Sequence, residues 1–347
     1  MGKFNRADLN EQNILFLEGS QMNTVPDQAA IPINKTSLLL PYLALLTATI
    51  ILSFAAILIR LTEFDLRPGA TVFNRYWIAA VTLSLWQSSK FVFARKTEPE
   101  DKPSEDVTFN DIIFFATESL MSFGCISLWA ISLTQTSVAN ANLLHNMTPL
   151  FTTLGGWLLL NQRFDNRFLV GMLIAILASS CIGFEDWFIS TSNFTGDILA
   201  LLSSVLYAGG FLTRESLRNK YSASTILLYS CFLRAVLALG LILMTEERFF
   251  PVTQSAWLSV LALGIIVQVF GHGLLTYSLK YVSSSFAAVC LLIDPLITAL
   301  LGWIIFAEKL TPLNLVSLIG VLVGIYLAIS AKGSLKSTAV EENVFEA

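Results

Sequence analysis

The chain contains few charged residues, few histidines and no motif for a metal or a nucleotide. Only 13% of its 347 residues are charged, and it has two histidines; a soluble domain carries about a quarter charged residues. No basic stripe is present, which argues against nucleic-acid binding. No Gly-rich phosphate loop or HExxH-type spacing occurs. We therefore expect no nucleic-acid partner, no metal, no cofactor and no ATP-driven pumping by this chain alone.

Long apolar segments dominate instead. Hydrophobic residues make up 54% of the chain, and runs of about 20 mostly apolar residues, the length that spans a bilayer, recur from Leu38 to Ser330. The four cysteines lie singly within these runs, so we interpret them as small buried hydrophobic residues. The sequence predicts an all-α integral membrane protein with ten transmembrane helices. The predicted spans are residues 36–61, 71–93, 111–133, 139–160, 168–187, 195–214, 224–245, 255–280, 284–306 and 311–331.

The two ends of the chain are polar. Residues 1–35 lack the short apolar region and cleavage site of a secretory signal, and we predict a disordered tail there and a second tail at 332–347. Fifteen of the 21 basic residues lie on one side of the predicted spans. Because basic residues near span ends stay on the cytoplasmic side, both tails are predicted to be cytoplasmic, in a plasma or inner membrane. The fifteen residues are Lys3, Arg6, Lys35, Lys90, Arg95, Lys96, Lys102, Arg163, Arg167, Arg214, Arg218, Lys220, Lys280, Lys332 and Lys336.

The sequence repeats itself at a shift of 146 residues. The segment 137–164 aligns with 283–310, and the alignment pairs Pro149 with Pro295 and two Gly-Trp dipeptides with each other. Spans four and nine therefore correspond, and five spans form one unit, 36–187 or 195–331. Since five is odd, the second unit must enter the membrane upside down. Inverted repeats are typical of secondary transporters, which expose a site near the bilayer midplane to each side in turn.

The repeated segments resemble a known family. "LWAISLTQTSVANANLLHNMTPLFTTLGGWLLLNQRF" (128–164) and "LTYSLKYVSSSFAAVCLLIDPLITALLGWIIFAEKL" (275–310) are similar to the EamA family of ten-helix carriers, in the drug/metabolite transporter superfamily. "NRYWIAAVTL" (74–83) is similar to the arginine-led second helix of these proteins. The resemblance implies ten helices around a central cavity lined mainly by spans one, three, four, six, eight and nine. It implies transport of amino acids, metabolites or drugs.

The chain departs from that family's pattern at three places. Gln162 stands where the first closing glutamate is usual, although Glu308 keeps the second. Asp294 precedes the second proline, and His145 lies in the fourth span. The resemblance therefore does not determine the cargo.

Asp294 is the first candidate for transport chemistry. It lies in the apolar run "LLIDPLITALLGW", where a carboxylate costs about 2.5–3.5 kcal/mol unless it faces protein or water. Pro295 removes a helix hydrogen bond and frees a carbonyl near Leu291. Asp294 is predicted to bind a cation or a proton there; the alternative is a protonated aspartate bonded to a neighbouring helix.

The fourth and third spans each carry a polar face. Asn142, His145, Asn146 and Pro149 follow helical spacing; they suit a polar or zwitterionic cargo, or they join helices. Glu118 lies on one face of the third span with Trp129, which is predicted to stack on a flat cargo or to anchor the span at the membrane interface.

Two arginines occupy like places in spans two and seven. Arg75 and Arg234 are predicted to form structural or gating contacts, with anion binding as the alternative. Glu118 is a candidate partner for either one. Pro149 and Pro295 are assigned to the same structural group.

The remaining candidates lie in spans six, eight and ten. Gln268 and His272 belong to a stripe at i+4 steps in span eight, and Tyr207 is predicted to offer a hydroxyl to the cavity. Gly320 and Gly324 form a close-packing pattern that serves internal contact or a dimer, so a monomer or a homodimer is expected.

Taken together, these patterns predict a secondary transporter, an exporter of small metabolites such as amino acids or drug-like solutes. It would work by alternating access with proton coupling through Asp294, Glu118 and the histidines, in contact with the lipid bilayer. We do not expect an enzyme, because neither histidine has an acidic neighbour in sequence. An intramembrane enzyme acting on lipid or peptide, a channel and a receptor remain alternatives.

Overall fold

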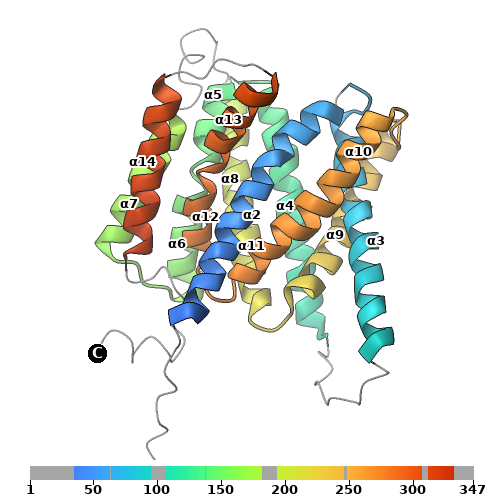
Figure 1. Ribbon diagram of the computed structural model, residues 1–347, viewed down its shortest axis with the longest axis horizontal. Coiled ribbons are helices and arrows are strands. Elements are labelled where there is room, and N and C mark those ends of the chain that lie inside the picture. Colours follow the sequence, from blue (N-terminus) through green and yellow to red (C-terminus); the bar gives the residue numbers. More distant parts are fainter. Residues whose placement is uncertain are drawn as a thin grey trace, which may run out of the picture.

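The computed structural model describes residues 35–62, 64–94, 107–136, 138–181, 194–245, 248–306 and 312–331 (Figure 1). These residues form helices and connections, with no strand among them, which confirms the predicted all-α class. Seven helices are long and apolar enough to cross a membrane, and Asn166–Ser180 is a shorter apolar helix. The elements are α2 (Lys35–Thr62), α3 (Pro68–Ala94), α4 (Phe109–Leu133), α5 (Val138–His145), α6 (Thr148–Leu160), α7 (Asn166–Ser180), α8 (Phe194–Arg218), α9 (Ala223–Thr245), α10 (Gln254–Ala262), the π-helix η2 (Leu263–Gly271), α11 (His272–Ser278), α12 (Ser284–Leu291), α13 (Asp294–Phe306) and α14 (Pro312–Ile329).

Each of the ten predicted spans coincides with helical structure, but three spans are composite. Span four is α5 and α6, span eight is α10, η2 and α11, and span nine is α12 and α13. Span six was predicted to end at 214, whereas α8 continues to Arg218. Span five was predicted to reach 187, whereas α7 ends at Ser180. The tails predicted to be disordered, 1–35 and 332–347, lie outside the described residues, apart from Lys35 at the start of α2.

Capping side chains position several helix starts. The Thr108 hydroxyl accepts the amide of Asp111, and the Asp111 carboxylate accepts the amide of Thr108 at 2.8 Å. Asp165, Thr253 and Ser283 cap α7, α10 and α12 in the same way. These residues accept backbone N–H groups that have no partner within the helix.

The packing of the helices follows the inverted repeat. In the repeat, α2, α3 and α4 correspond to α8, α9 and the composite α10–η2–α11. The contact of α4 with α8 has its counterpart in the contact of α2 with the composite span. The self-corresponding pairs α3 with α9 and α7 with α14 also pack together. Figure 1 shows α7 and α14 side by side at one edge of the bundle and α3 beside α9 at the other. These reciprocal contacts indicate a two-fold relation between the units.

Glycines bring α7 and α14 close together. A Cβ built on Gly171 would lie 2.6 Å from the Gly324 carbonyl oxygen, and one on Gly324 would lie 2.5 Å from the Gly171 oxygen. A Cβ on Gly320 would lie 2.6 Å from Cβ of Ala178. The Gly320 and Gly324 pattern is therefore used inside the chain, where small residues let helix backbones approach.

At the end of the bundle where α2 and α9 finish, Asp65 joins the two units. Its Oδ2 accepts the amides of Thr253 at 2.8 Å and Val252 at 2.7 Å, and Arg248 lies 3.6 Å away. The Thr253 and Val252 amides hold the pKa of Asp65 below its usual range. On the same end, the Thr136 hydroxyl donates to Asp197 at 2.6 Å.

At the opposite end, Glu215 joins three segments. Its Oε1 accepts Nε2 of Gln162 at 2.7 Å, and its Oε2 accepts the amide of Ser284 at 2.8 Å. Glu215 is buried, and Ser284 is the first residue of α12. Each end of the bundle thus carries a contact between the two units, made by Asp65 at one end and by Glu215 with Gln162 at the other.

Candidate functional site

A buried ion cluster lies between α4, α8 and α9. Oε1 of Glu118 accepts Nε of Arg214 at 3.0 Å and Nη2 of Arg214 at 2.5 Å, and it also accepts Nη2 of Arg234. The three side chains are at most 3% exposed. Two cations therefore share one carboxylate away from water. Such a cluster persists because removing one partner would leave an uncompensated buried charge.

The Glu118 cluster agrees with one predicted pairing and corrects another assignment. Of the two candidate partners of Glu118, the structure places Arg234 in contact and Arg75 elsewhere. Arg214, predicted from the sequence to be one of the basic residues of a connection, is instead buried within α8. The mainly apolar run before Arg214 is the sequence signal for its burial, because the helix formed by that run continues past position 214.

Arg75 contacts the composite eighth span. Its Nε donates to Oε1 of Gln268 at 2.9 Å, and its Nη2 contacts Nε2 of His272 at 3.1 Å. Gln268 is fully buried, and its Nε2 reaches Sγ of Cys231 on α9 at 3.6 Å. Arg75 and His272 are half-buried. Gln268 lies in the π-helix and His272 directly follows it. The sequence pattern did not predict this π-helix, a feature that is frequent at functional sites.

The two predicted arginines thus make reciprocal contacts. Arg75, from the second span of the first unit, reaches the third span of the second unit. Arg234, from the second span of the second unit, reaches Glu118 on the third span of the first. The partners differ in charge: Arg234 meets a carboxylate, and Arg75 meets an amide and an imidazole. The two arginines therefore occupy equivalent positions in the repeat, but only Arg234 has a negatively charged partner among the described residues.

An aromatic cluster lies beside these contacts. The ring of His145 stacks on Tyr207, with centroids 5.6 Å apart, and lies 5.9 Å from Trp129. Nδ1 of His145 is 2.9 Å from the Ser203 hydroxyl, which itself donates to Ala200. Ser203 has one hydroxyl proton, so Nδ1 of His145 carries a proton and donates it. Tyr207 also lies within electrostatic range of Asp294 and Arg75.

The fourth and ninth spans are interrupted at equivalent places. α5 ends at His145 and α6 begins at Thr148, while α12 ends at Leu291 and α13 begins at Asp294. The prediction that Asn142, His145, Asn146 and Pro149 share one helix face assumed a continuous helix. It is wrong for Pro149, which lies on the second helix, whereas Asn146, in the turn, still donates its amide to the Asn142 carbonyl at 2.8 Å. Proline disrupts the turn that precedes it, which accounts for both interruptions.

The predicted polar residues around the interruptions are partly covered, and Oδ1 of Asp294 is buried without a hydrogen-bond partner in the described structure. Asp294, Asn142 and Asn146 are half-buried. Within the described part of the chain, the side chains of the two asparagines make no hydrogen bond. Asp294 interacts with the hydroxyl groups of Ser53 and Thr298, and Thr298 donates to the Ser53 carbonyl at 3.1 Å. Glu308 lies outside the described residues.

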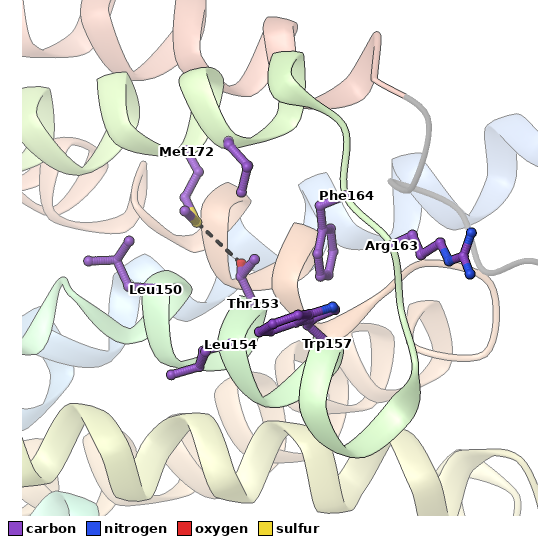
Figure 2. Close-up of a pocket in the computed structure, with 8 residues that line it drawn as sticks. Leu150, Thr153, Leu154, Trp157, Arg163, Phe164 and Met172 are labelled. Carbon is purple, nitrogen blue, oxygen red and sulfur yellow. Dashed lines mark hydrogen bonds between the residues drawn. The ribbon is translucent and has the colours of Figure 1, made fainter.

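A pocket of about 580 Å³ lies away from all of these residues, between α6, α7 and their connection (Figure 2). Its lining is mainly apolar, and Thr153 donates to Sδ of Met172 at 3.2 Å across it. Leu154 and Trp157 are exposed on the outer surface of the bundle. None of the predicted site residues lines this pocket. The polar groups between the units are the better candidate site, since they combine charge with burial. Among the described residues, no group of three His, Cys, Asp or Glu side chains is placed to hold a metal ion.

Comparisons with known proteins agree with this architecture. A solved crystal structure that is 16% identical superposes with a TM-score of 0.68 over 85% of this chain and 98% of that one, which shows the fold. An uncharacterized transporter of Archaeoglobus fulgidus is 27% identical over 85% of this chain and 97% of its own length. The pseudopaline exporter CntI of Pseudomonas aeruginosa is 27% identical over 49% of this chain and 58% of its own. The profile of the EamA-like transporter family matches residues 39–184 and 194–330. The chain therefore belongs to the EamA-like transporter family and is an integral membrane transporter rather than an enzyme.

Proposed function

We propose that the protein is a secondary carrier that moves a small polar solute by alternating access, with the solute held between the two units. The observation that carries this proposal is the reciprocal reach of Arg75 and Arg234 from each unit into the other. Contacts of this kind lie at a repeat interface, where carriers of inverted-repeat design bind their substrates.

The contacts at the two ends act as gates in this proposal. Asp65 with the Val252 and Thr253 amides closes one end, and Glu215 with Gln162 and the Ser284 amide closes the other. Asp65 with the two amides and Glu215 with Gln162 each join different units, so rocking one unit against the other breaks one of these contacts while the other holds. The structure then corresponds to an occluded state, closed at both ends.

Asp294 is the proposed site of proton coupling. The Thr148 hydroxyl donates at 2.7 Å to the carbonyl of His145, which Pro149 leaves without its helix donor. In the ninth span Asp294 replaces that threonine. A protonated Asp294 can donate to the carbonyl of Leu291, and an ionised one cannot. Proton binding would therefore change the hydrogen bonding of the helix interruption itself.

Solute class, direction and orientation are further parts of the proposal. The half-buried Asn142, Asn146 and His145, with Trp129 and Tyr207 beside them, suit amino acids or drug-like solutes that combine polar and flat groups. Export is supported by the relative named as a pseudopaline exporter. Cytoplasmic tails in a plasma or inner membrane are supported by the excess of basic residues at one end of the bundle.

Counterflow in proteoliposomes tests the proposal. Liposomes loaded with one unlabelled amino acid are diluted into the same amino acid carrying a label, and the panel covers neutral, acidic and basic amino acids. A carrier accumulates label transiently, and the accumulation saturates with concentration. Flux that does not saturate would instead indicate a channel, and no flux of any solute across the panel would contradict the proposal.

A further inference from the structure

Among the residues that the structure describes, the guanidinium group of Arg75 has no negative partner. In the described residues no carboxylate lies within ion-pair distance of it, and its hydrogen-bond partners are the neutral side chains of Gln268 and His272. Both partners lie on the eighth span, so the guanidinium points toward the inside of the bundle. An arginine inside a membrane span normally pairs with an acid or with carbonyl groups. The positive charge of Arg75 is therefore uncompensated within the described part of the chain.

His272, next to Arg75, carries a hydrogen-bond donor without a partner among the described residues. An arginine can only donate, so Nε2 of His272 must accept from Nη2 of Arg75. The proton of the neutral ring then resides on Nδ1. That atom is buried and has no hydrogen-bond partner in the described structure. A buried N–H group without a partner is costly, and a ligand that accepts a hydrogen bond would remove that cost.

The surroundings of His272 are positive. The guanidinium groups of Arg75, Arg214 and Arg234 all lie within electrostatic range of its ring. Tyr76 lies between two of them, with its ring centroid 5.8 Å from Arg75 and 5.5 Å from Arg234. The only carboxylate in contact with any of the three is Glu118, among the residues that the structure describes, and it is already shared by Arg214 and Arg234.

We propose that Arg75 binds a carboxylate group of the transported solute and that the Nδ1–H group of His272 donates to a second acceptor atom of the same solute, so that the cargo is a carboxylate-bearing metabolite. The inference rests on the proposed carrier function and names its substrate class. A carboxylate accepts from the guanidinium and neutralises the charge of Arg75. The Nδ1–H group of His272 points away from that guanidinium, since Nε2 faces it, and therefore meets a different acceptor of the solute. Gln268, held by Cys231 on its other side, positions the guanidinium for that contact.

Ligand-induced thermal stabilisation of the purified, detergent-solubilised protein tests the inference. The probes are L-aspartate, L-glutamate, L-leucine and citrate, and each of the amino acids is paired with the derivative in which its carboxylates are converted to amides. We expect at least one carboxylate to raise the melting temperature and its amide to have no effect. The variants Arg75→Gln and His272→Phe should bind that carboxylate at least about tenfold more weakly. Arg75→Lys, which keeps the charge, should retain part of the affinity, and Arg248→Gln should match the wild type.

Two results would overturn the inference. One is a wild-type protein that none of the carboxylates stabilises more than their amides, and the other is full stabilisation of Arg75→Gln by the same carboxylate. Elution of each variant as a single monodisperse peak shows that a loss of binding is not a loss of folding. Carboxylate binding without counterflow would contradict the carrier and leave the inference standing. Saturable counterflow of a solute without a carboxylate would support the carrier and overturn the inference.

Discussion

Thr148 and Asp294 occupy the same place in the two halves of the chain, each as the first residue after a helix interruption and directly before a proline. Thr148 donates its hydroxyl to the carbonyl of His145, three residues earlier. Asp294 has the carbonyl of Leu291 at the corresponding position and a side chain that donates only when it is protonated. One interruption is therefore permanently satisfied, and the other depends on a proton.

Substituting Asp294 tests this dependence. The variant Asp294→Thr reproduces the first interruption in the second half, and it should keep the fold while the pH dependence of solute counterflow is lost. Asp294→Asn should also remove the pH dependence. Counterflow in proteoliposomes at several pH values measures both. A pH profile of Asp294→Thr that matches the wild type would remove Asp294 from the coupling mechanism.

Loss of the Glu118 carboxylate should destabilise the protein strongly. The variant Glu118→Gln leaves Arg214 and Arg234 buried without a counter-ion, and breaking a buried pair from one side costs about 3–5 kcal/mol. Thermal unfolding in detergent measures the loss. The control is Asp111→Asn at the start of α4, which removes the charge that faces the exposed Lys220 but keeps a side-chain oxygen for the Thr108 amide, so little change is expected. Equal melting temperatures for the two variants would contradict the role given to the buried cluster.

Opening of the Glu215 gate should expose Cys290. The variant Glu215→Ala removes the acceptor of Gln162 and of the Ser284 amide at the start of α12. Cys290 lies on the same helix and is buried in the closed structure. In a chain whose other three cysteines are replaced by alanine, alkylation of Cys290 by N-ethylmaleimide should be several-fold faster than with Glu215 present. Unchanged labelling would show that Glu215 does not hold that end closed.

The contact of Asp65 should respond to acid but not to changes near neutral pH. Because the amides of Thr253 and Val252 lower the pKa of Asp65 in the folded protein, its stabilising contribution is complete above the ordinary carboxyl pKa of about 3.9. The contribution is lost as the pH falls through the lowered pKa. The difference in melting temperature between wild type and Asp65→Asn should thus be constant from about pH 5 to 8 and shrink below about pH 4. A difference that changes between pH 6 and 8 would point to another group.

Side chains added at Gly171 should separate α7 from α14. In Gly171→Ala the new Cβ meets the Gly324 carbonyl oxygen at 2.6 Å, and that backbone atom cannot rotate away. The matched control is Gly240→Ala on α9, where a Cβ meets nothing within 4 Å and a gain of about 0.4–1 kcal/mol is expected. Thermal unfolding of the two variants should move in opposite directions. A stabilised Gly171→Ala would contradict the close packing of the two helices.

Much of the architecture could be predicted from local patterns. Apolar runs of bilayer length and the repeat around Pro149 and Pro295 were sufficient for ten helical spans in two related units. The interruptions at these prolines were only partly predictable. Pro295 indicated an open helix near Leu291, whereas the spacing of Asn142, His145, Asn146 and Pro149 was interpreted as one continuous face. A periodic pattern does not reveal where a helix stops within it.

The partners of the charged residues could not be predicted. Arg214 was predicted to lie in a connection, and the sequence did not distinguish Arg75 from Arg234 as the partner of Glu118. Its ion pairs join residues 96 and 116 positions apart, and no local pattern specifies such distances. The π-helix before His272, from which Gln268 meets Arg75, was likewise not predicted from the sequence.

By itself the sequence determined that this chain is helical, spans the membrane and is built from two inverted units, because burial in lipid requires long apolar helices and an odd number of spans per unit inverts the second. Only the tertiary structure decided that Arg234 is neutralised by Glu118 while Arg75 is left with an amide and an imidazole. The physical reason is that charge compensation within a membrane depends on which side chains meet across helices, and that is set by three-dimensional packing rather than by position along the chain.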